Sequence, residues 1–190
     1  MSKKLILLIG APGSGKTTDT KAIASNHKEV TSYSLGELLK DESQKDTKLG
    51  KINRDYIKKG DLVPTAIVID TICTTIQNAP TDIVLIDGFP RKAKQMKLFA
   101  DLVADVNRVD LHAVIEIRVS EEVARQRVES FSDFDEDVFA HSMEIYQETI
   151  SEIEKFYNHD ALLKVIDGEQ EALVVIAEID AFLGSLVELA

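Results

Sequence analysis

Five short runs of apolar or β-prone residues divide the chain, and longer stretches with helical spacing separate them. The runs cover residues 5–9, 30–34, 83–86, 113–119 and 162–166. Residues 83–86 are apolar at every position and lie between Pro80 and Gly88, which is typical of a central parallel strand buried on both faces. The pattern therefore predicts five β-strands.

Between these runs, apolar residues recur at three- and four-residue intervals. This spacing predicts helices that open at residues 18 and 35, and further helices over 51–59, 65–77, 120–128, 138–157 and 171–186. A polar stretch over 41–49 and a short, acidic, irregular stretch over 130–137 interrupt them. Alternating strands and helices predict a doubly wound α/β domain: a five-stranded parallel sheet with helices on both faces and ligands at the carboxyl ends of its strands.

The length of 190 residues, with no internal repeat or linker, predicts one domain over residues 1–190. The apolar run at residues 5–9 is too short for a signal-peptide core or a membrane span, so we expect a cytoplasmic protein without a membrane anchor. Cys73 is the only cysteine and lies in an apolar helical stretch, which predicts a buried, reduced thiol.

The net charge of −11 argues against nucleic-acid binding, which depends on a basic surface. The charges are also unevenly distributed. Residues 1–100 carry 16 Lys and Arg against 11 Asp and Glu, whereas residues 101–190 carry 6 against 22. We therefore expect phosphate-binding groups mostly in the first half and a solvated acidic surface in the second.

The segment after the first predicted strand, residues 10–17, reads Gly-Ala-Pro-Gly-Ser-Gly-Lys-Thr and fits the pattern G-x-x-x-x-G-K-[ST]. Glycines at 10, 13 and 15 let consecutive backbone N–H groups turn toward an anion. Lys16 would then lie beside the β- and γ-phosphates, Thr17 would offer its hydroxyl to Mg²⁺, and the following helix would point its positive end at the phosphates. A glycine-rich turn without a ligand would not need the Lys-Thr pair, so the sequence predicts a nucleoside triphosphate site in a domain of the P-loop NTPase type.

A second acidic element is expected at the carboxyl end of a neighbouring strand, and Asp87 follows residues 83–86 directly. Such a carboxylate holds Mg²⁺ or its water in phosphoryl transfer, and a nearby cation such as Arg91 neutralises the moving group. The alternative is a turn at Asp87-Gly88 with Arg91 as a helix cap. For Arg127, at the end of a predicted helix, the residues alone leave a surface role and a functional role equally open.

These segments together resemble adenylate kinases in identity, order and spacing. They are residues 10–17, 34–40, 60–64, 87–91 with Gln95, and 166–168. The resemblance covers nearly the whole chain and is closest to bacterial members with a short lid. It implies reversible transfer of the γ-phosphoryl group from ATP to AMP, giving two ADP, with Mg²⁺ as cofactor and a monomeric protein.

By this resemblance, residues 34–63 form a mobile monophosphate-binding segment and residues 128–137 a short lid. Lys16, Arg91 and Arg127 would be catalytic, with Arg91 on the acceptor phosphate and Arg127 facing the ATP phosphates. The implied ATP-binding residues are Gly10, Pro12, Gly13, Ser14, Gly15, Lys16, Thr17, Thr18 and Arg127. The implied AMP-binding residues are Leu35, Gly36, Lys40, Asp61, Leu62, Val63, Gly88, Phe89, Pro90, Arg91 and Gln95. Gln95 would hydrogen-bond adenine, and Thr17 and Asp87 would hold Mg²⁺, directly or through water.

The chain departs from the family pattern at five positions. Leu35 and Lys40 stand where the family has Thr and Arg. The first change removes a hydroxyl near the acceptor, and the second replaces a guanidinium that can bind phosphate through two N–H groups with a single compact ammonium. Phe131, Asp133 and Ser142 stand where short-lid members carry arginines. Cations there would stabilise the transition state, and losing one such group costs on the order of a hundredfold in rate.

The acidic residues at 135–137 either repel the triphosphate or cap the helix that follows, and both can hold at once. Two functional hypotheses remain. The first is a nucleoside monophosphate kinase, with AMP favoured by Gln95 and a pyrimidine monophosphate as a variant. The second is a catalytically impaired paralogue that binds nucleotide as a structural or regulatory ligand.

Overall fold

The computed structural model describes residues 2–105 and 109–187. The elements in chain order are β1 (Lys3–Ile9), α1 (Lys16–Asn26), β2 (Val30–Ser34), α2 (Leu35–Ser43), α3 (Lys48–Ile57), α4 (Thr65–Asn78), β3 (Ile83–Asp87), α5 (Ala93–Asp105), β4 (Val109–Arg118), α6 (Glu121–Val128), α7 (Glu136–His159), β5 (Leu163–Asp167) and α8 (Ala172–Leu186). Within these two described ranges, none of the helices combines the length and the apolar composition that a membrane span requires.

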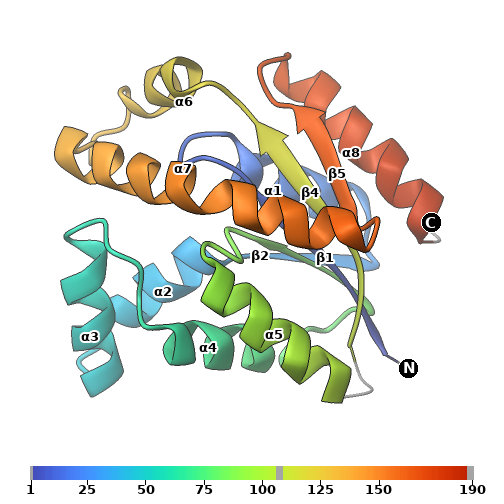
Figure 1. The fold of residues 1–190 in the computed structure, drawn as a ribbon, viewed down its shortest axis with the longest axis horizontal. Coiled ribbons are helices and arrows are strands. Elements are labelled where there is room, and N and C mark those ends of the chain that lie inside the picture. The colour runs from blue at the N-terminus through green and yellow to red at the C-terminus, as the bar shows by residue number, and fades with distance from the viewer. Residues whose placement is uncertain (1, 106–108, 188–190) are drawn as a thin grey trace.

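The five strands form one parallel sheet in the order β2-β3-β1-β4-β5. Strand β1 lies in the centre, between β3 and β4, and the chain winds outward from it in both directions (Figure 1). Such a reversal in strand order opens a crevice at the carboxyl ends of the strands. The predicted doubly wound α/β fold is therefore confirmed.

Alternate residues of β1 supply the two faces of the core. Leu5 and Leu7 pack into a cluster with residues of α4, α5 and α7, whereas Ile6 and Leu8 pack into a second cluster with α1 and α8. All four side chains are fully buried. The continuous apolar run is thus explained by helices that cover both faces of the sheet.

Helix α5 is absent from the elements predicted above. Met96 and Phe99 form its buried face, at 0% and 2% exposure, and pack against the cluster that contains Leu5. The predicted environment of Cys73 is also only partly right. Its side chain packs against this cluster but is half-buried rather than fully buried.

Several predicted boundaries are wrong by a few residues. Helix α3 spans Lys48–Ile57 rather than 51–59, because the side chain of its N-cap, Thr47, accepts a hydrogen bond from the Gly50 N–H. Helix α1 begins at Lys16 rather than residue 18, because Gly15 in the left-handed conformation is its N-cap. Helix α7 begins at Glu136 rather than residue 138, because the side chain of Asp135 accepts a hydrogen bond from the Val138 N–H. Strand β4 begins at Val109 rather than residue 113, because it pairs with β1 from its first residues onward.

Candidate active site

The glycine loop joins the carboxyl end of β1 to α1. Gly13 and Gly15 have φ angles of 79° and 100°, a region that residues with a side chain rarely adopt. A Cβ atom at Gly13 would lie 2.5 Å from the backbone oxygen of Ala124 in α6. The loop therefore needs glycine for its backbone shape and for its close approach to the next layer.

The ammonium of Lys16 lies over this loop. Its Nζ donates to the backbone oxygens of Gly10 and Ala11 at 3.0 and 2.7 Å and to Ser14 Oγ at 2.9 Å. Enclosure by the protein removes water from the ammonium and, with a smaller effect of the Arg91 charge, lowers the pKa of Lys16 to about 8. An anion bound in the loop would favour the charged form.

Asp87 is the last residue of β3 and is almost fully buried, at 2% exposure. Its Oδ1 accepts from Thr17 Oγ1 and Ser34 Oγ, both at 3.1 Å, and its Oδ2 accepts from Thr20 Oγ1 at 3.3 Å. Burial raises the pKa of Asp87, although the nearby Lys16 charge and the hydroxyls of Ser34 and Thr17 oppose that shift. Three hydroxyls from α1 and the end of β2 thus surround one carboxylate beside the glycine loop.

The hydroxyl of Thr17 and the carboxylate of Asp87 fit a Mg²⁺ ion. Mg²⁺ takes one or two protein oxygens and fills its remaining positions with phosphate oxygens and water. In residues 2–105 and 109–187, no group of three His, Cys, Asp or Glu side chains forms a metal cluster on its own. A metal held here would therefore need the phosphates of a ligand as additional partners.

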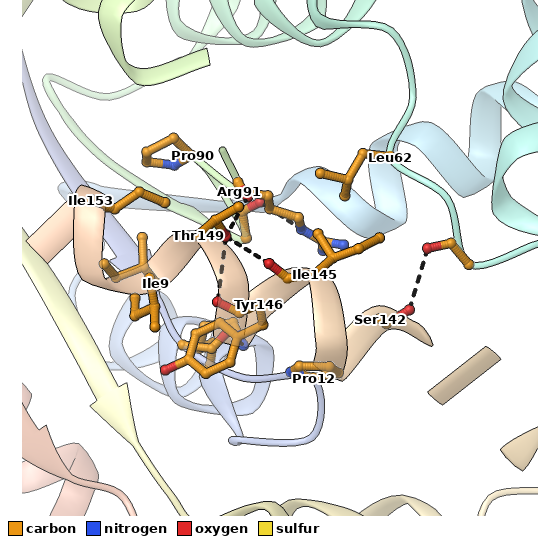
Figure 2. Close-up of a pocket in the computed structure, with 15 residues that line it drawn as sticks. Ile9, Pro12, Leu62, Pro90, Arg91, Ser142, Ile145, Tyr146, Thr149 and Ile153 are labelled. Carbon is orange, nitrogen blue, oxygen red and sulfur yellow. Dashed lines mark hydrogen bonds between the residues drawn. The ribbon is translucent and has the colours of Figure 1, made fainter. Parts of the chain in front are cut away.

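A cavity of about 120 Å³ lies between the glycine loop, the end of β3 and α7, and we call it the central cavity (Figure 2). Its lining includes Lys16 from the glycine loop and Arg91 from the segment after β3. Ile9, Ile145 and Ile153 contribute apolar walls. The central cavity thus combines two cations with partly apolar walls, and a lower local dielectric strengthens electrostatic interactions with an anion.

A second cavity of about 240 Å³, the side cavity, lies against α2 and the segment after α3. Eight of the eleven predicted AMP-binding residues line it, namely Leu35, Gly36, Lys40, Asp61, Leu62, Val63, Arg91 and Gln95. Gly60, Leu62, Arg91 and Ser142 line both cavities. The two cavities are therefore neighbours, with Arg91 at their junction.

The other three predicted AMP-binding residues lie in or beside the central cavity. Gly88 and Pro90 line it. Phe89 is fully buried in the core, where its ring meets the ring of Phe99 edge-on at 5.1 Å between centroids. The Phe89 side chain therefore holds α5 against the sheet, and any ligand contact at this position falls to its backbone.

Arg91 is held by hydrogen bonds from three directions. Its Nε donates to the backbone oxygen of Gly88 at 2.9 Å, and its backbone N–H donates to Gln95 Oε1 at 2.8 Å. Thr149 on α7 donates its hydroxyl to the Arg91 backbone oxygen at 3.0 Å, or to Ile145 and Tyr146 of its own helix (Figure 2). Side chains from α5 and α7 thus fix the backbone that carries this guanidinium.

Arg127 lies on the opposite side of the glycine loop. Its Nη1 donates to the Ser14 backbone oxygen at 3.1 Å and its Nη2 donates to the Gly168 backbone oxygen at 2.7 Å. It lines an outer cavity of about 170 Å³ together with Thr18 and Asp19. Burial raises the pKa of Asp19 to about 6, and the Arg127 charge opposes that shift. Arg127 therefore joins the glycine loop to the loop after β5.

The loop between α6 and α7 contains the positions where the sequence lacks the expected arginines. Phe131 is 59% exposed. Asp133 accepts a hydrogen bond from Lys40 Nζ at 3.2 Å, and because both side chains are exposed, this ion pair contributes less than about 1 kcal/mol. Asp135 caps α7, which confirms the capping interpretation of the acidic stretch.

A second contact joins α7 to the segment after α3. His141 Nε2 lies 2.9 Å from Asp61 Oδ1, and this hydrogen bond, with the nearby Glu144 carboxylate, raises the pKa of His141. Ser142 Oγ donates to the Gly60 backbone oxygen at 3.5 Å. Asp61 and Lys40, both predicted to contact the acceptor, therefore have partners on α7 or the loop before it.

Sequence reasoning missed several residues of the site. Ser34 and Thr20 were not linked to Asp87, and Thr149 was not linked to Arg91. One signal was available for α7: Ser142, Tyr146 and Thr149 recur at helical spacing and face the cavities. For the hydroxyls around Asp87, the sequence offers no comparable signal, because they meet only where β2 and α1 both pack beside β3.

Comparison with known proteins gives consistent matches. A family model described as adenylate kinase matches residues 8–162. The chain is 45% identical over 196 residues to the adenylate kinase of a Sulfurovum species, with 97% of this chain and 100% of the relative covered. It is 42% identical over 189 residues to that of Campylobacter lari, covering 98% and 100%, and 43% identical over 185 residues to that of a Nitratiruptor species, covering 95% of each.

Proposed function

The chain belongs to the adenylate kinase family, and from this premise we propose that it transfers the γ-phosphoryl group of ATP to AMP, giving two ADP. It is a nucleoside monophosphate kinase, and hence a phosphotransferase. The main support for this reaction is that two cations, Lys16 of the glycine loop and Arg91, line the same central cavity, and that Arg91 also lines the side cavity. A donor and an acceptor phosphate bound at these two cations would meet there.

The proposed mechanism depends on positioning and electrostatics and needs no covalent intermediate. The glycine loop and Lys16 hold the β- and γ-phosphates of ATP. Arg91 holds the phosphate of AMP so that one of its oxygens faces the γ-phosphorus. Apolar walls from Ile9 and Ile145 exclude water that would otherwise accept the phosphoryl group.

We propose Mg²⁺ as the cofactor, held by the Thr17 hydroxyl and the Asp87 carboxylate, directly or through water. When bound, the ion neutralises charge on the β- and γ-phosphate oxygens. The burial of Asp87 supports this assignment, because a buried carboxylate with a raised pKa gains from a nearby cation. The hydroxyls of Ser34 and Thr20 keep its two oxygens in fixed directions.

The acceptor base would occupy the side cavity. Leu35, Leu62 and Val63 supply apolar surface for its faces, and Gln95 supplies an amide for its edge. Residues 34–63 would form the segment that moves on acceptor binding, and residues 128–137 the short lid. Arg127 would reach the ATP phosphates from the outer cavity, where it contacts the loop backbone. We also propose that the protein is a monomer located in the cytoplasm.

Nothing in the geometry or in the names of these relatives supports the second hypothesis, a paralogue that only binds nucleotide. The residues that the chemistry requires, Lys16, Asp87 and Arg91, lie together around the central cavity or beside it. The absence of arginine at 131, 133 and 142 concerns the rate of the reaction rather than the assembly of the two phosphate sites.

Steady-state turnover tests this proposal. Purified protein with Mg·ATP is assayed for ADP formation against AMP, CMP, UMP, GMP and shikimate, above the background without acceptor. We expect AMP to be the preferred acceptor, and Lys16→Ala to abolish transfer while the circular dichroism spectrum stays unchanged. No ADP formation with any acceptor, with ATP still bound tightly, would contradict the proposal.

A further inference from the structure

Gln95 makes a contact that recognition of a base alone does not require. It lines the side cavity, yet only 1% of its surface is exposed, and its Oε1 accepts a hydrogen bond from the backbone N–H of Arg91 at 2.8 Å. Arg91 in turn lines both the side cavity and the central cavity. One side chain thus connects the cavity for the base with the cation for the acceptor phosphate.

The chemistry of this contact fixes the orientation of the Gln95 amide. A backbone N–H only donates, so the group facing it must be the oxygen and not the NH₂. The NH₂ is then the part of the amide left to meet a ligand. A base that presents an acceptor nitrogen to it leaves the contact with Arg91 undisturbed.

A base that presents a ring N–H cannot pair with the NH₂, because both groups donate, and must use the oxygen instead. The base would then share Oε1 with the Arg91 N–H or turn the amide over, and either outcome weakens or removes the hydrogen bond that Gln95 accepts from Arg91. Loss of one such hydrogen bond weakens binding several-fold, so the mismatch would affect the residue that holds the phosphate as well as the base. The remaining contacts of Arg91, from Gly88 and Thr149, would then orient it alone.

We propose that Gln95 is a positioning residue for Arg91, and that it couples the identity of the acceptor base to the grip on the acceptor phosphate. This inference rests on the proposed function, because it takes Arg91 as the acceptor-phosphate ligand. It goes further in assigning Gln95 an effect on a part of the substrate that Gln95 does not touch.

The test uses ribose 5-phosphate, which carries the ribose and phosphate of AMP and no base. Its inhibition constant against AMP is measured at saturating Mg·ATP in the parent protein, in Gln95→Met, and in Gln147→Met as a matched control. Gln147 lies on the exposed face of α7, where it donates to Glu121. We expect Gln95→Met to raise the inhibition constant about fivefold, the loss typical of one hydrogen bond, and Gln147→Met to leave it within about twofold.

An unchanged inhibition constant in Gln95→Met, with a raised KM for AMP, would overturn the coupling and leave Gln95 as a base contact only. Arg91→Ala distinguishes failure of the coupling through Gln95 from failure of the assignment of Arg91 to the acceptor phosphate. If Arg91→Ala weakens ribose 5-phosphate binding and Gln95→Met does not, the coupling alone fails. If Arg91→Ala has no effect, the assignment of Arg91 to the acceptor phosphate fails, and the coupling fails with it.

A second measurement needs no variant, in case Gln95→Met does not fold. Adenosine carries the base without the phosphate, and its binding should secure the Gln95 amide and slow hydrogen exchange at the Arg91 backbone N–H. Slower exchange at Arg91 on adding adenosine supports the coupling. Exchange that stays the same while adenosine occupies the site contradicts it.

Discussion

The affinity for ATP should fall as the pH rises through the pKa of Lys16. Its ammonium, enclosed by the glycine loop, has a pKa of about 8 in the absence of ligand. We expect only the charged form to bind the phosphates well, because the neutral amine supplies no charge to the β- and γ-phosphate oxygens. Bound phosphates favour the ammonium, so binding is coupled to proton uptake above this pH.

The size of the effect follows from the pKa. A group with a pKa of about 8 is about 90% charged at pH 7 and about 10% charged at pH 9. The apparent affinity for Mg·ATP should therefore fall about tenfold between these two pH values, which equals about 1.4 kcal/mol. A lysine with its ordinary pKa of 10.5 would stay almost fully charged over the same range.

Isothermal titration calorimetry of Mg·ATP without acceptor, at pH 7, 8 and 9 and constant ionic strength, measures this dependence. Lys16→Met is the control, because it keeps an unbranched side chain, one atom shorter, without a titrating group. We expect the variant to bind weakly and with little change in affinity over the range. An affinity of the parent protein that is constant within twofold, or an equal decline in Lys16→Met, would show that the charge of Lys16 does not control ATP binding over this range.

Three further predictions concern other parts of the site. Thr149→Val should lower kcat several-fold by freeing the Arg91 carbonyl, whereas Thr71→Val, which removes only a bond to Ile67 within α4, should not; equal kcat values in the two variants would contradict the role of Thr149. Ser142→Arg places a guanidinium at the junction of the central and side cavities. It should raise kcat about tenfold or more, because an added cation stabilises the charge on the transferred phosphoryl group; an unchanged kcat would mean that this position does not reach that group. The pKa of Asp19 is raised to about 6, so in the unfolded chain this carboxyl loses its proton at a lower pH than in the folded protein. The free energy of unfolding should therefore fall as the pH rises from about 4 to 6. Thermal melts of Asp19→Asn should lack this fall, and identical pH profiles for the two proteins would show that Asp19 does not cause it.

Much of the fold could be predicted because each strand can be recognised from a short run of apolar residues in its own sequence. The run at residues 83–86 is apolar at each position and ends at Asp87, so the strand and the carboxylate at its carboxyl end can be read together. The glycine loop is equally local, since its backbone angles depend on its own glycines. Helix α5 was not predicted. Its buried residues Met96 and Phe99 follow the motif at residues 87–91 and Gln95, which were interpreted only as ligand-binding residues.

The arrangement of side chains within the site could be predicted only in part. The side cavity does gather Leu35, Leu62 and Gln95, which are far apart in the sequence. The partners of these residues depend on packing between elements. Helical spacing indicates that Thr149 lies on the cavity face of α7, but it does not indicate the contact with Arg91, 58 positions away. Phe89 shows the reverse case, because a residue of the motif proves to be part of the core.

The fate of the γ-phosphoryl group distinguishes transfer to AMP from hydrolysis and from nucleotide binding alone. Purified protein is given ATP labelled at the γ-phosphate together with Mg²⁺ and unlabelled AMP, and the products are separated. We expect the label to appear in ADP as its β-phosphate, with two ADP formed for each AMP consumed, and Arg91→Ala to reduce this transfer strongly. Label that remains in ATP, or appears only as inorganic phosphate at a rate independent of AMP, would contradict it.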